Sequence, residues 1–448
     1  MKSVPLALLV LLAGSLGVTS CTRCSPNGPP GESTSPQASA SSSVDAGPAG
    51  RCTLLGAPRI VGALPGEDAA PPEGPVAYGA EIGGALADTK GFVVGIRTAG
   101  LSGVAQLLEQ SFEGAAPRLL ATLPTITGTG GARAPLLATS PDGARLVGTL
   151  SIEDKTRTFH VARLGEGGVV TPVGEVAQGK DESEAVAFLG AAKAPLVAWD
   201  DADEKLRIGR VRALLLGMAA KEAKEAKPAG KDAGALEDDV VSPATSDAAW
   251  PALALSPNGD RAVLVWLSER PESESVDGGE GEPSQALAFR WVEAAVLDLA
   301  TGARVGAARA LTPLDGHAQT VTATWSDAGL VLAVRDDARP TDGDGGELWA
   351  VRVPIDAAGG FGAATRLSIA EKEVAPGIAA LLPRPGGALV AWLGQDGASH
   401  LSPAFTPGAA SIEPSLRDRK ILATHGDRAL ASRIVGSGVE LTVVRCGT

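Results

Sequence analysis

Pro135-Leu-Leu-Ala-Thr-Ser-Pro141-Asp142-Gly143-Ala-Arg-Leu-Val-Gly148 recurs further along the chain as Pro251-Ala-Leu-Ala-Leu-Ser-Pro257-Asn258-Gly259-Asp-Arg-Ala-Val-Leu-Val-Trp266. Each copy sets a tight turn between two short apolar runs. In such a turn the proline fixes φ at the second turn position, and the Asp or Asn tolerates the backbone conformation of the third. The glycine then takes a positive φ. The pattern therefore predicts two β-hairpins. Their expected turn residues are Pro141, Asp142, Gly143, Pro257, Asn258 and Gly259.

Five weaker copies of this pattern lie elsewhere in the chain, each followed after a polar loop by another β-type run. They begin at Ala87, Gly190, Trp325, Arg384 and Thr424. Seven copies at intervals of about 40 to 70 residues, with about four short strands in each, are typical of a β-propeller. We therefore predict an all-β chain that folds as a single β-propeller, with seven blades favoured over six. The alternative is a pair of β-sandwiches or another repetitive all-β fold.

The Ser-Pro-Asp-Gly turn resembles the repeats of WD-like propellers. Such repeats occur in the Tol-system periplasmic protein and in the propeller domain of prolyl-oligopeptidase-type peptidases. The resemblance covers roughly residues 76–445 and implies the architecture but no particular activity. In the peptidases the hydrolase lies outside the repeats, and here no second domain remains to hold one.

The two ends of the repeat region each carry a cysteine, Cys52 and Cys446. A propeller must join its first and last strands, and residues 53–61 and 441–445 are candidate strands for that junction. Pairing them antiparallel places the two cysteines side by side, so we predict that a disulfide closes the ring. Cys24 is left over, and the sequence leaves open whether it is free, modified or bonded to another chain.

The first residues are typical of a secretory signal peptide. Lys2 precedes an apolar run that is too short to span a membrane comfortably and that ends at Val18-Thr19-Ser20-Cys21. This ending resembles the lipobox of bacterial lipoproteins, which implies that residues 1–20 are removed and that Cys21 is lipidated. An ordinary signal peptide and an uncleaved anchor are the alternatives.

The residue after the predicted anchor is Thr22 rather than Asp. By resemblance to the sorting pattern of enteric bacteria, this implies the outer membrane, with the protein facing the periplasm or the cell surface. The chain would then contact the membrane through the lipid on Cys21.

Composition divides the chain into three predicted regions: the signal peptide, a tether over 21–51 and the propeller over 52–448. The tether is rich in Pro, Gly, Ser and Ala, so it cannot bury enough apolar surface to offset its ordering entropy. Within the propeller, about 217–248 reads as a low-complexity insertion, because Ala219–Lys227 has helix propensity but no apolar face.

Charge and motifs restrict the function. A net charge of −13 argues against nucleic acid as a partner. The chain has no nucleophile elbow, zinc-protease motif or phosphate loop, so we expect no catalytic residue, no metal and no cofactor. Asp342–Glu347 partly resembles a calcium loop, but a solvated acidic loop explains it better. The four histidines, His160, His317, His400 and His425, fall in different repeats.

These observations predict a non-enzymatic, membrane-anchored lipoprotein of the cell envelope. Its propeller would act as a scaffold that binds a partner protein of the envelope or presents a ligand, since function on such a fold lies in the loops grafted onto it. The alternative is a small-ligand-binding protein or a hydrolytic enzyme that uses the channel of the propeller.

Overall fold

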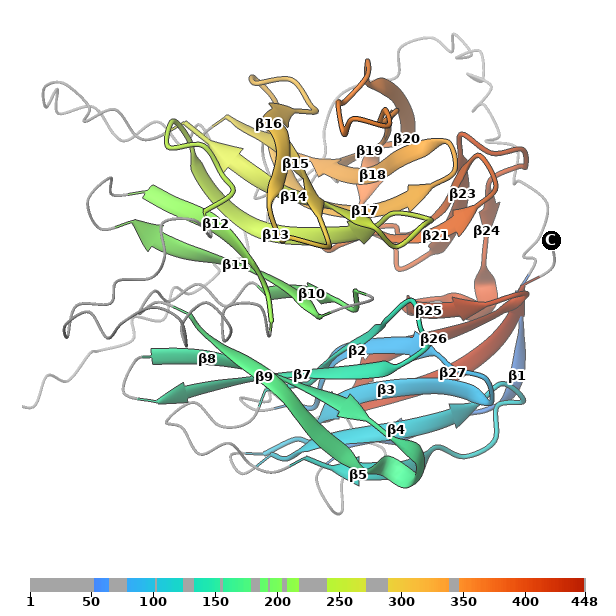
Figure 1. Ribbon diagram of the computed structural model, residues 1–448. Coiled ribbons are helices and arrows are strands. Elements are labelled where there is room, and N and C mark those ends of the chain that lie inside the picture. The colour runs from blue at the N-terminus through green and yellow to red at the C-terminus, as the bar shows by residue number, and fades with distance from the viewer. Residues whose placement is uncertain are drawn as a thin grey trace, which may run out of the picture. The chain divides into compact units, whose positions relative to one another are not determined.

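The chain forms seven small antiparallel sheets arranged around a centre (Figure 1). The computed structural model describes residues 52–63, 79–100, 103–123, 133–153, 156–178, 186–191, 194–203, 208–216, 240–270, 289–337 and 346–446. The predicted all-β, seven-bladed propeller is confirmed, which excludes the sandwich and six-bladed alternatives. The signal peptide, Cys21, Cys24, the whole tether and most of the calcium-like loop lie outside the described residues.

The blades follow one another along the chain. Blade 1 contains β2 (Glu81–Ala87), β3 (Gly91–Arg97), β4 (Ala105–Ser111) and β5 (Arg118–Thr122). Blade 2 contains β6 (Leu136–Thr139), β7 (Arg145–Glu153), β8 (Thr156–Leu164) and β9 (Val170–Gln178). Blade 3 contains β10 (Val186–Leu189), β11 (Leu196–Asp203) and β12 (Ile208–Leu215). Blade 4 contains β13 (Asp247–Leu255), β14 (Arg261–Glu269), β15 (Arg290–Asp298) and β16 (Arg304–Ala310).

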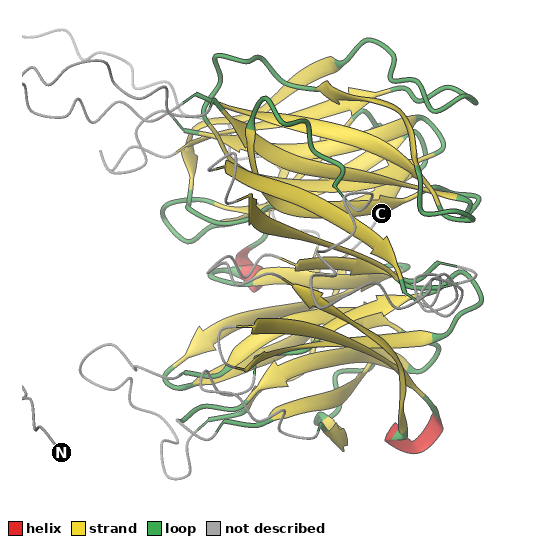
Figure 2. Cartoon of the chain, turned by 60° about the vertical axis from the view of Figure 1, so that its left-hand side comes forward, coloured by secondary structure: helices red, strands yellow, loops and turns green. Residues whose placement is uncertain are grey.

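The remaining three blades complete the ring. Blade 5 contains β17 (Ala318–Ser326), β18 (Gly329–Asp336), β19 (Gly346–Val353) and β20 (Thr365–Val374). Blade 6 contains β21 (Ala380–Arg384), β22 (Gly387–Leu393), β23 (Ser399–Ala404) and β24 (Ser411–Ile412). Blade 7 contains β25 (Lys420–His425), β26 (Arg428–Val435), β27 (Gly438–Cys446) and the N-terminal β1 (Cys52–Val61). In the described residues, helix is limited to short 3-10 turns such as Glu166–Gly168 and Pro414–Leu416 (Figure 2).

Blade 3 has three described strands rather than four. The predicted insertion of about 217–248 follows its last strand, and the described part of that segment lies against the blade. Val240 forms an isolated antiparallel bridge with Arg212, and the hydroxyl of Ser242 accepts the amide N–H of Val211 at 2.9 Å. Residues 247 and 248 already belong to β13, the first strand of blade 4.

The two turns from which the repeat was recognised have the predicted conformation. Gly143 has φ +80° and Gly259 has φ +71°. In both turns the glycine amide donates to the carbonyl of the serine three residues earlier, at 2.8 Å for Ser140 and 2.9 Å for Ser256. The local sequence therefore determines these hairpins without help from distant residues.

The second strands of the blades are buried on both faces, which explains their nearly continuous apolar sequences. In β3, Phe92, Val94 and Ile96 pack toward blade 7. Val93, between them, packs toward blade 2. Side chains alternate between the two faces of a strand, so one strand supplies the core on both of its sides.

The core consists of seven apolar clusters, and each of them joins one pair of neighbouring blades. Trp199, Trp266 and Trp392, which come from the second strands of blades 3, 4 and 6, are nearly or fully buried in three different clusters. Because the clusters run through every junction, the ring is closed by packing as well as by strand pairing.

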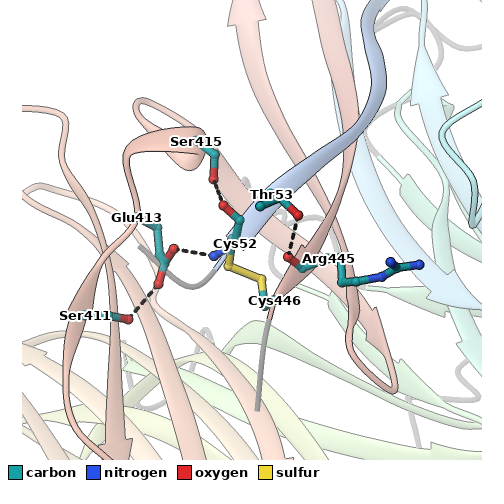
Figure 3. The surroundings of a disulfide bond; sticks show 7 residues. All are labelled: Cys52, Thr53, Ser411, Glu413, Ser415, Arg445 and Cys446. Atoms are coloured by element: carbon teal, nitrogen blue, oxygen red, sulfur yellow. Dashed lines mark hydrogen bonds between the residues drawn. A yellow bond between two sulfur atoms is a disulfide. The ribbon is translucent and has the colours of Figure 1, made fainter. Parts of the chain in front are cut away.

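The predicted closure of the ring is confirmed. β1 pairs antiparallel with β27, Cys52 lies opposite Cys446, and a disulfide joins the two (Figure 3). The segment that follows β24 of blade 6 also binds the start of β1. Glu413 accepts the amide N–H of Cys52 at 2.8 Å, and Ser415 donates to the carbonyl of Cys52 at 2.8 Å. The first strand of the chain is thereby tied to both of the last two blades.

Candidate functional site

The centre of the ring contains a cavity of about 610 Å³, which we call the central cavity. The first strands of neighbouring blades contact one another there, and β2, β17, β21 and β25 contribute side chains to the wall. Much of this wall is small or apolar, as at Gly83, Ala85, Ala380 and Leu381. Small-molecule sites have volumes of about 300–1,000 Å³, so the central cavity is the candidate binding site.

Lys420, the first residue of β25, lines both the central cavity and a smaller side pocket of about 120 Å³. Within the described part of the chain, no carboxylate pairs with its ammonium. The residue is exposed to water through the cavity, and the partial loss of hydration at the cavity wall lowers the pKa of Lys420. A cation with a perturbed pKa that lines a cavity is a candidate for ligand binding.

Two arginines beside Lys420 share one carboxylate. Arg419 and Arg433 approach Glu440 to 2.6 and 2.9 Å. Burial pushes the pKa of Glu440 upward, but the hydrogen bonds from the two guanidinium groups outweigh it and leave the pKa below the ordinary value. Since one carboxylate faces two guanidinium groups, Arg419, Arg433 and Glu440 together carry one positive charge beside Lys420. The chain as a whole has a net charge of −13.

The side pocket adds an aromatic wall. The imidazole of His400 stacks on the indole of Trp392, with the ring centroids 3.9 Å apart and the planes 6° from parallel. Burial lowers the pKa of His400 despite the opposing effect of Asp396 and Glu373, so the imidazole is neutral at pH 7. Lys420, which has no carboxylate partner among the described residues, supplies the positive charge at the junction of the pocket and the cavity.

An exposed tryptophan is a further feature of the inner strands. Trp250 is 62% exposed, has φ +59° and lies in a β-bulge of β13. Its amide donates to Asp200 of blade 3 at 3.1 Å. Backbone strain at an exposed aromatic residue marks a position worth testing for ligand contact. Sequence analysis missed Trp250, because the bulge that turns it outward depends on the pairing of β13 with β14.

The histidines singled out from the sequence lie in different blades, as predicted. His160 is in β8 of blade 2, His317 directly precedes β17, and His400 is in β23. His425 ends β25 and stacks on Phe112, with centroids 4.7 Å apart. Among the described residues, no group of three or more His, Cys, Asp or Glu is arranged to hold a metal ion, and no helix is long and apolar enough to cross a membrane.

Lys420 was not recognised from the sequence. It is the last of four charged residues, 417–420, that precede the apolar part of β25. That charged cluster was the available signal, but a charged loop before a strand is usually solvated. Only the packing of blade 7 against blades 1 and 6 shows that Lys420 lines the central cavity.

No family model matches the chain, and no curated protein matches it. Solved structures do. Kuenenia stuttgartiensis hydrazine synthase matches at 14% identity and a TM-score of 0.47, over 83% of this chain and 98% of that one. The β-propeller domain of the trilobed protease from Pyrococcus furiosus matches at 11% identity and a TM-score of 0.44, over 83% of this chain and 96% of that one. The GH93 α-L-arabinofuranosidase of Fusarium graminearum matches at 12% identity and a TM-score of 0.42, over 83% of this chain and 95% of that one.

These comparisons correct the prediction that the chain is not an enzyme. Glycoside hydrolases of the GH93 and GH43 families are prominent among the matched propellers. A propeller without recognisable catalytic motifs is therefore no ground for excluding catalysis. At identities of 11–12% the likeness is one of fold, and it assigns no reaction to this chain.

Proposed function

We propose that this chain is a lipid-anchored protein of the cell envelope whose propeller binds an anionic ligand in the central cavity. The observation that carries the proposal is the unpaired ammonium of Lys420 at the junction of the cavity and the side pocket. A carboxylate or phosphate group of the ligand would pair with Lys420, and the small and apolar wall would accept the rest of the molecule.

Electrostatics favours an anion over a cation at this position. Arg419 and Arg433 hold Glu440 between them, so this carboxylate is already engaged, and Asp418, which also lines the cavity, has an exposed side chain 4.0 Å from Arg417. The neutral His400 adds no competing charge. An anion that enters the cavity would give the ammonium of Lys420 a charged partner at the cavity wall.

The anchor part of the proposal rests on residues 1–24. The ending Val18-Thr19-Ser20-Cys21 supports lipidation of Cys21, and Thr22 supports sorting to the outer membrane. A protein of the periplasm or the cell surface would then hold its ligand, or a partner protein that carries the anionic group, close to the membrane.

The ligand site is tested by thermal melting with inorganic phosphate, succinate and citrate as probes. A ligand that binds only the folded state increases the free energy of unfolding, by about 2.7 kcal/mol at a concentration of 100 times its Kd, and so raises the melting temperature. We expect at least one probe to stabilise the wild type, Lys420→Arg to keep part of the effect and Lys420→Met to lose it.

The matched control is Lys90→Met, which removes the same charge from an exposed turn of blade 1. Phosphate and citrate also stabilise proteins by exclusion from their surface, and this general effect must be equal in the two methionine variants. Equal shifts in Lys420→Met and Lys90→Met, or no shift with any probe, would contradict the proposed site.

The anchor is tested separately by cell fractionation. Cys21→Ser should move the protein from the membrane fraction to the soluble fraction. If a cleaved Cys21→Ser protein stayed with the membranes, the lipid would not be what holds it there. This result leaves the ligand site untouched, because Lys420 lies in the propeller.

A further inference from the structure

Blade 2 brings together a serine, a histidine and a glutamate on three adjacent strands. Ser151 is in β7, His160 in β8 and Glu175 in β9. The hydroxyl of Ser151 lies 2.9 Å from Nε2 of His160, and a carboxylate oxygen of Glu175 lies 3.1 Å from Nδ1 of the same ring. The imidazole thus bridges the two outer members of the group, with one nitrogen directed to each.

The donors and acceptors of this group can be assigned from chemistry. An ionised carboxylate only accepts hydrogen bonds, so Glu175 requires the proton on Nδ1 of a neutral imidazole. Nε2 then has a free lone pair and accepts from the hydroxyl of Ser151. This is the arrangement by which a histidine takes a proton from a serine while a carboxylate orients the ring.

A cavity of about 520 Å³ lies beside the imidazole. His160, Glu175 and Thr149 contribute its polar side chains, and Leu123, Val147 and Val170 are among its apolar ones. Thr149 lies directly opposite His160 in the pairing of β7 with β8, which offers a hydroxyl donor near the histidine. The cavity suits a substrate that combines a polar reacting group with a short apolar chain.

We propose that Ser151, His160 and Glu175 form a nucleophilic site that cleaves esters of short apolar acyl groups. Ser151 is the nucleophile, His160 the general base and Glu175 a positioning residue that acts through His160. Ser151 is 6% exposed and is not among the residues that line the cavity, so the carbonyl group of a bound substrate has to approach its hydroxyl past His160, which does line it. The site lies on the second to fourth strands of blade 2, away from Lys420, and the proposal does not depend on ligand binding in the central cavity.

The reaction balances without a cofactor. Oγ of Ser151 bonds to the ester carbonyl carbon while its proton passes to Nε2 of His160, and Thr149 donates to the carbonyl oxygen, where negative charge develops. The ester C–O bond breaks, and the leaving alkoxide takes the proton from Nε2 and departs as an alcohol. Water then attacks the acyl group on Ser151, again with His160 as base, and releases the carboxylic acid and the free serine.

The test uses the purified full-length protein and a fluorophosphonate with a short alkyl chain. This reagent loses fluoride and bonds to an activated serine, and peptide mapping by mass spectrometry locates the adduct. We expect one adduct, on Ser151, and none at that position in Ser151→Ala. His160→Gln should slow its formation about 100-fold, because a positioned general base contributes that order of rate.

Ser326→Ala is the matched control. Ser326 also belongs to a strand and is 7% exposed, but its hydroxyl donates to the carbonyl of Gly329. Labelling of Ser151 should be unchanged in this variant, and the wild type should hydrolyse p-nitrophenyl butyrate while Ser151→Ala should not. Folded wild type that gives no adduct on Ser151, or an adduct that forms at the same rate in His160→Gln, would overturn the proposal.

Discussion

At the residue scale, the clearest relation between sequence and conformation is at the hairpin glycines. Gly143 has φ +80°, and a Cβ atom built there would have no neighbour within 4 Å. Any cost of a side chain at this position therefore comes from the backbone and not from lack of space.

We predict that Gly143→Ala lowers the free energy of unfolding by about 1–2 kcal/mol, because alanine disfavours the left-handed region. Gly143→Asn should cost less, since asparagine enters that region more readily. Urea unfolding of the three proteins measures both values. Equal losses for Ala and Asn would mean that the backbone conformation at Gly143 is not the cause.

Glu440 links a single carboxylate to the pH dependence of stability. Its pKa lies below the ordinary value of 4.5, because the hydrogen bonds from Arg433 and Arg419 outweigh burial. A carboxyl whose pKa is lower in the folded state stabilises the fold above about pH 4.5, and this contribution is lost as the pH falls through the folded-state pKa.

We predict that Glu440→Gln is less stable than the wild type at pH 7 by on the order of 2 kcal/mol, since the nearly buried guanidinium of Arg419 and the partly exposed one of Arg433 lose their charged partner. The difference should shrink as the pH falls from 4.5, where the wild type protonates the same group. Melting curves of both proteins from pH 7 to pH 3 test this. A difference that stays constant with pH would show that the glutamine acts through packing alone.

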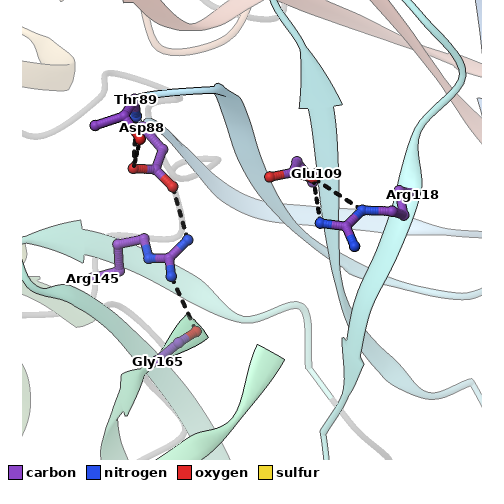
Figure 4. A network of polar contacts seen from close by, with 6 residues as sticks. All are labelled: Asp88, Thr89, Glu109, Arg118, Arg145 and Gly165. Carbon is purple, nitrogen blue, oxygen red and sulfur yellow. Dashed lines mark hydrogen bonds and ion pairs between the residues drawn. The ribbon is translucent and has the colours of Figure 1, made fainter. Parts of the chain in front are cut away.

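At the scale of the elements, two ion pairs of blades 1 and 2 differ in what they join (Figure 4). Arg145, the first residue of β7, pairs at 2.8 Å with Asp88 in the β2–β3 turn and also donates to the carbonyl of Gly165. Glu109 and Arg118 pair at 2.6 Å within blade 1, but the arginine side chain is 67% exposed. The first pair connects two blades, and the second connects two strands that are already paired.

We predict that a double-mutant cycle with alanine gives a coupling of about 1–2 kcal/mol for Asp88 and Arg145, because the pair is half-buried and its hydrogen bonds are charged. For Glu109 and Arg118 the coupling should be below about 1 kcal/mol, as for other exposed pairs. Thermal unfolding of the two cycles provides the comparison. The reverse order would mean that shielding from water does not decide the strength of these pairs.

At the scale of the whole molecule, stability depends on the closure of the ring. Seven clusters join the blades in sequence, and six of those junctions are crossed by the continuous chain between successive blades. The seventh lies between blade 7 and blade 1, and the chain crosses it from β1, the N-terminal strand that completes blade 7, to β2; the pairing of β1 with β27 and the disulfide, both inside blade 7, hold β1 in place there. Loss of this junction would expose strand edges and apolar side chains together.

We predict that Cys52→Ala, or reduction of the wild type, lowers stability by several kcal/mol. The bonded cysteines are 394 positions apart, and the chain-entropy model gives an upper bound of about 6 kcal/mol for such a loop. Cys24→Ala should have little effect, because it lies in the segment predicted to be the tether. A melt that does not respond to reduction would show that strand pairing and Glu413 suffice to close the ring.

Much of the architecture could be predicted from the sequence. The turns at Gly143 and Gly259 depend on neighbouring residues only, and their repetition reveals the blades. The junction of Cys52 with Cys446 was predictable because a ring has one pair of ends and those ends carry the cysteines. The turns were inferred from local sequence and the cysteine pairing from the topology of a closed ring, and neither inference requires knowing which side chains contact one another.

The candidate sites were decided by the tertiary structure. Lys420 becomes a cavity residue because four blades contribute to the wall of the central cavity around it. Ser151, His160 and Glu175 belong to three separate strands, so nothing in their spacing along the chain indicates contact. The pairing of strands and the packing of blades set which polar groups meet and how much water reaches them, and those two quantities decide their chemistry.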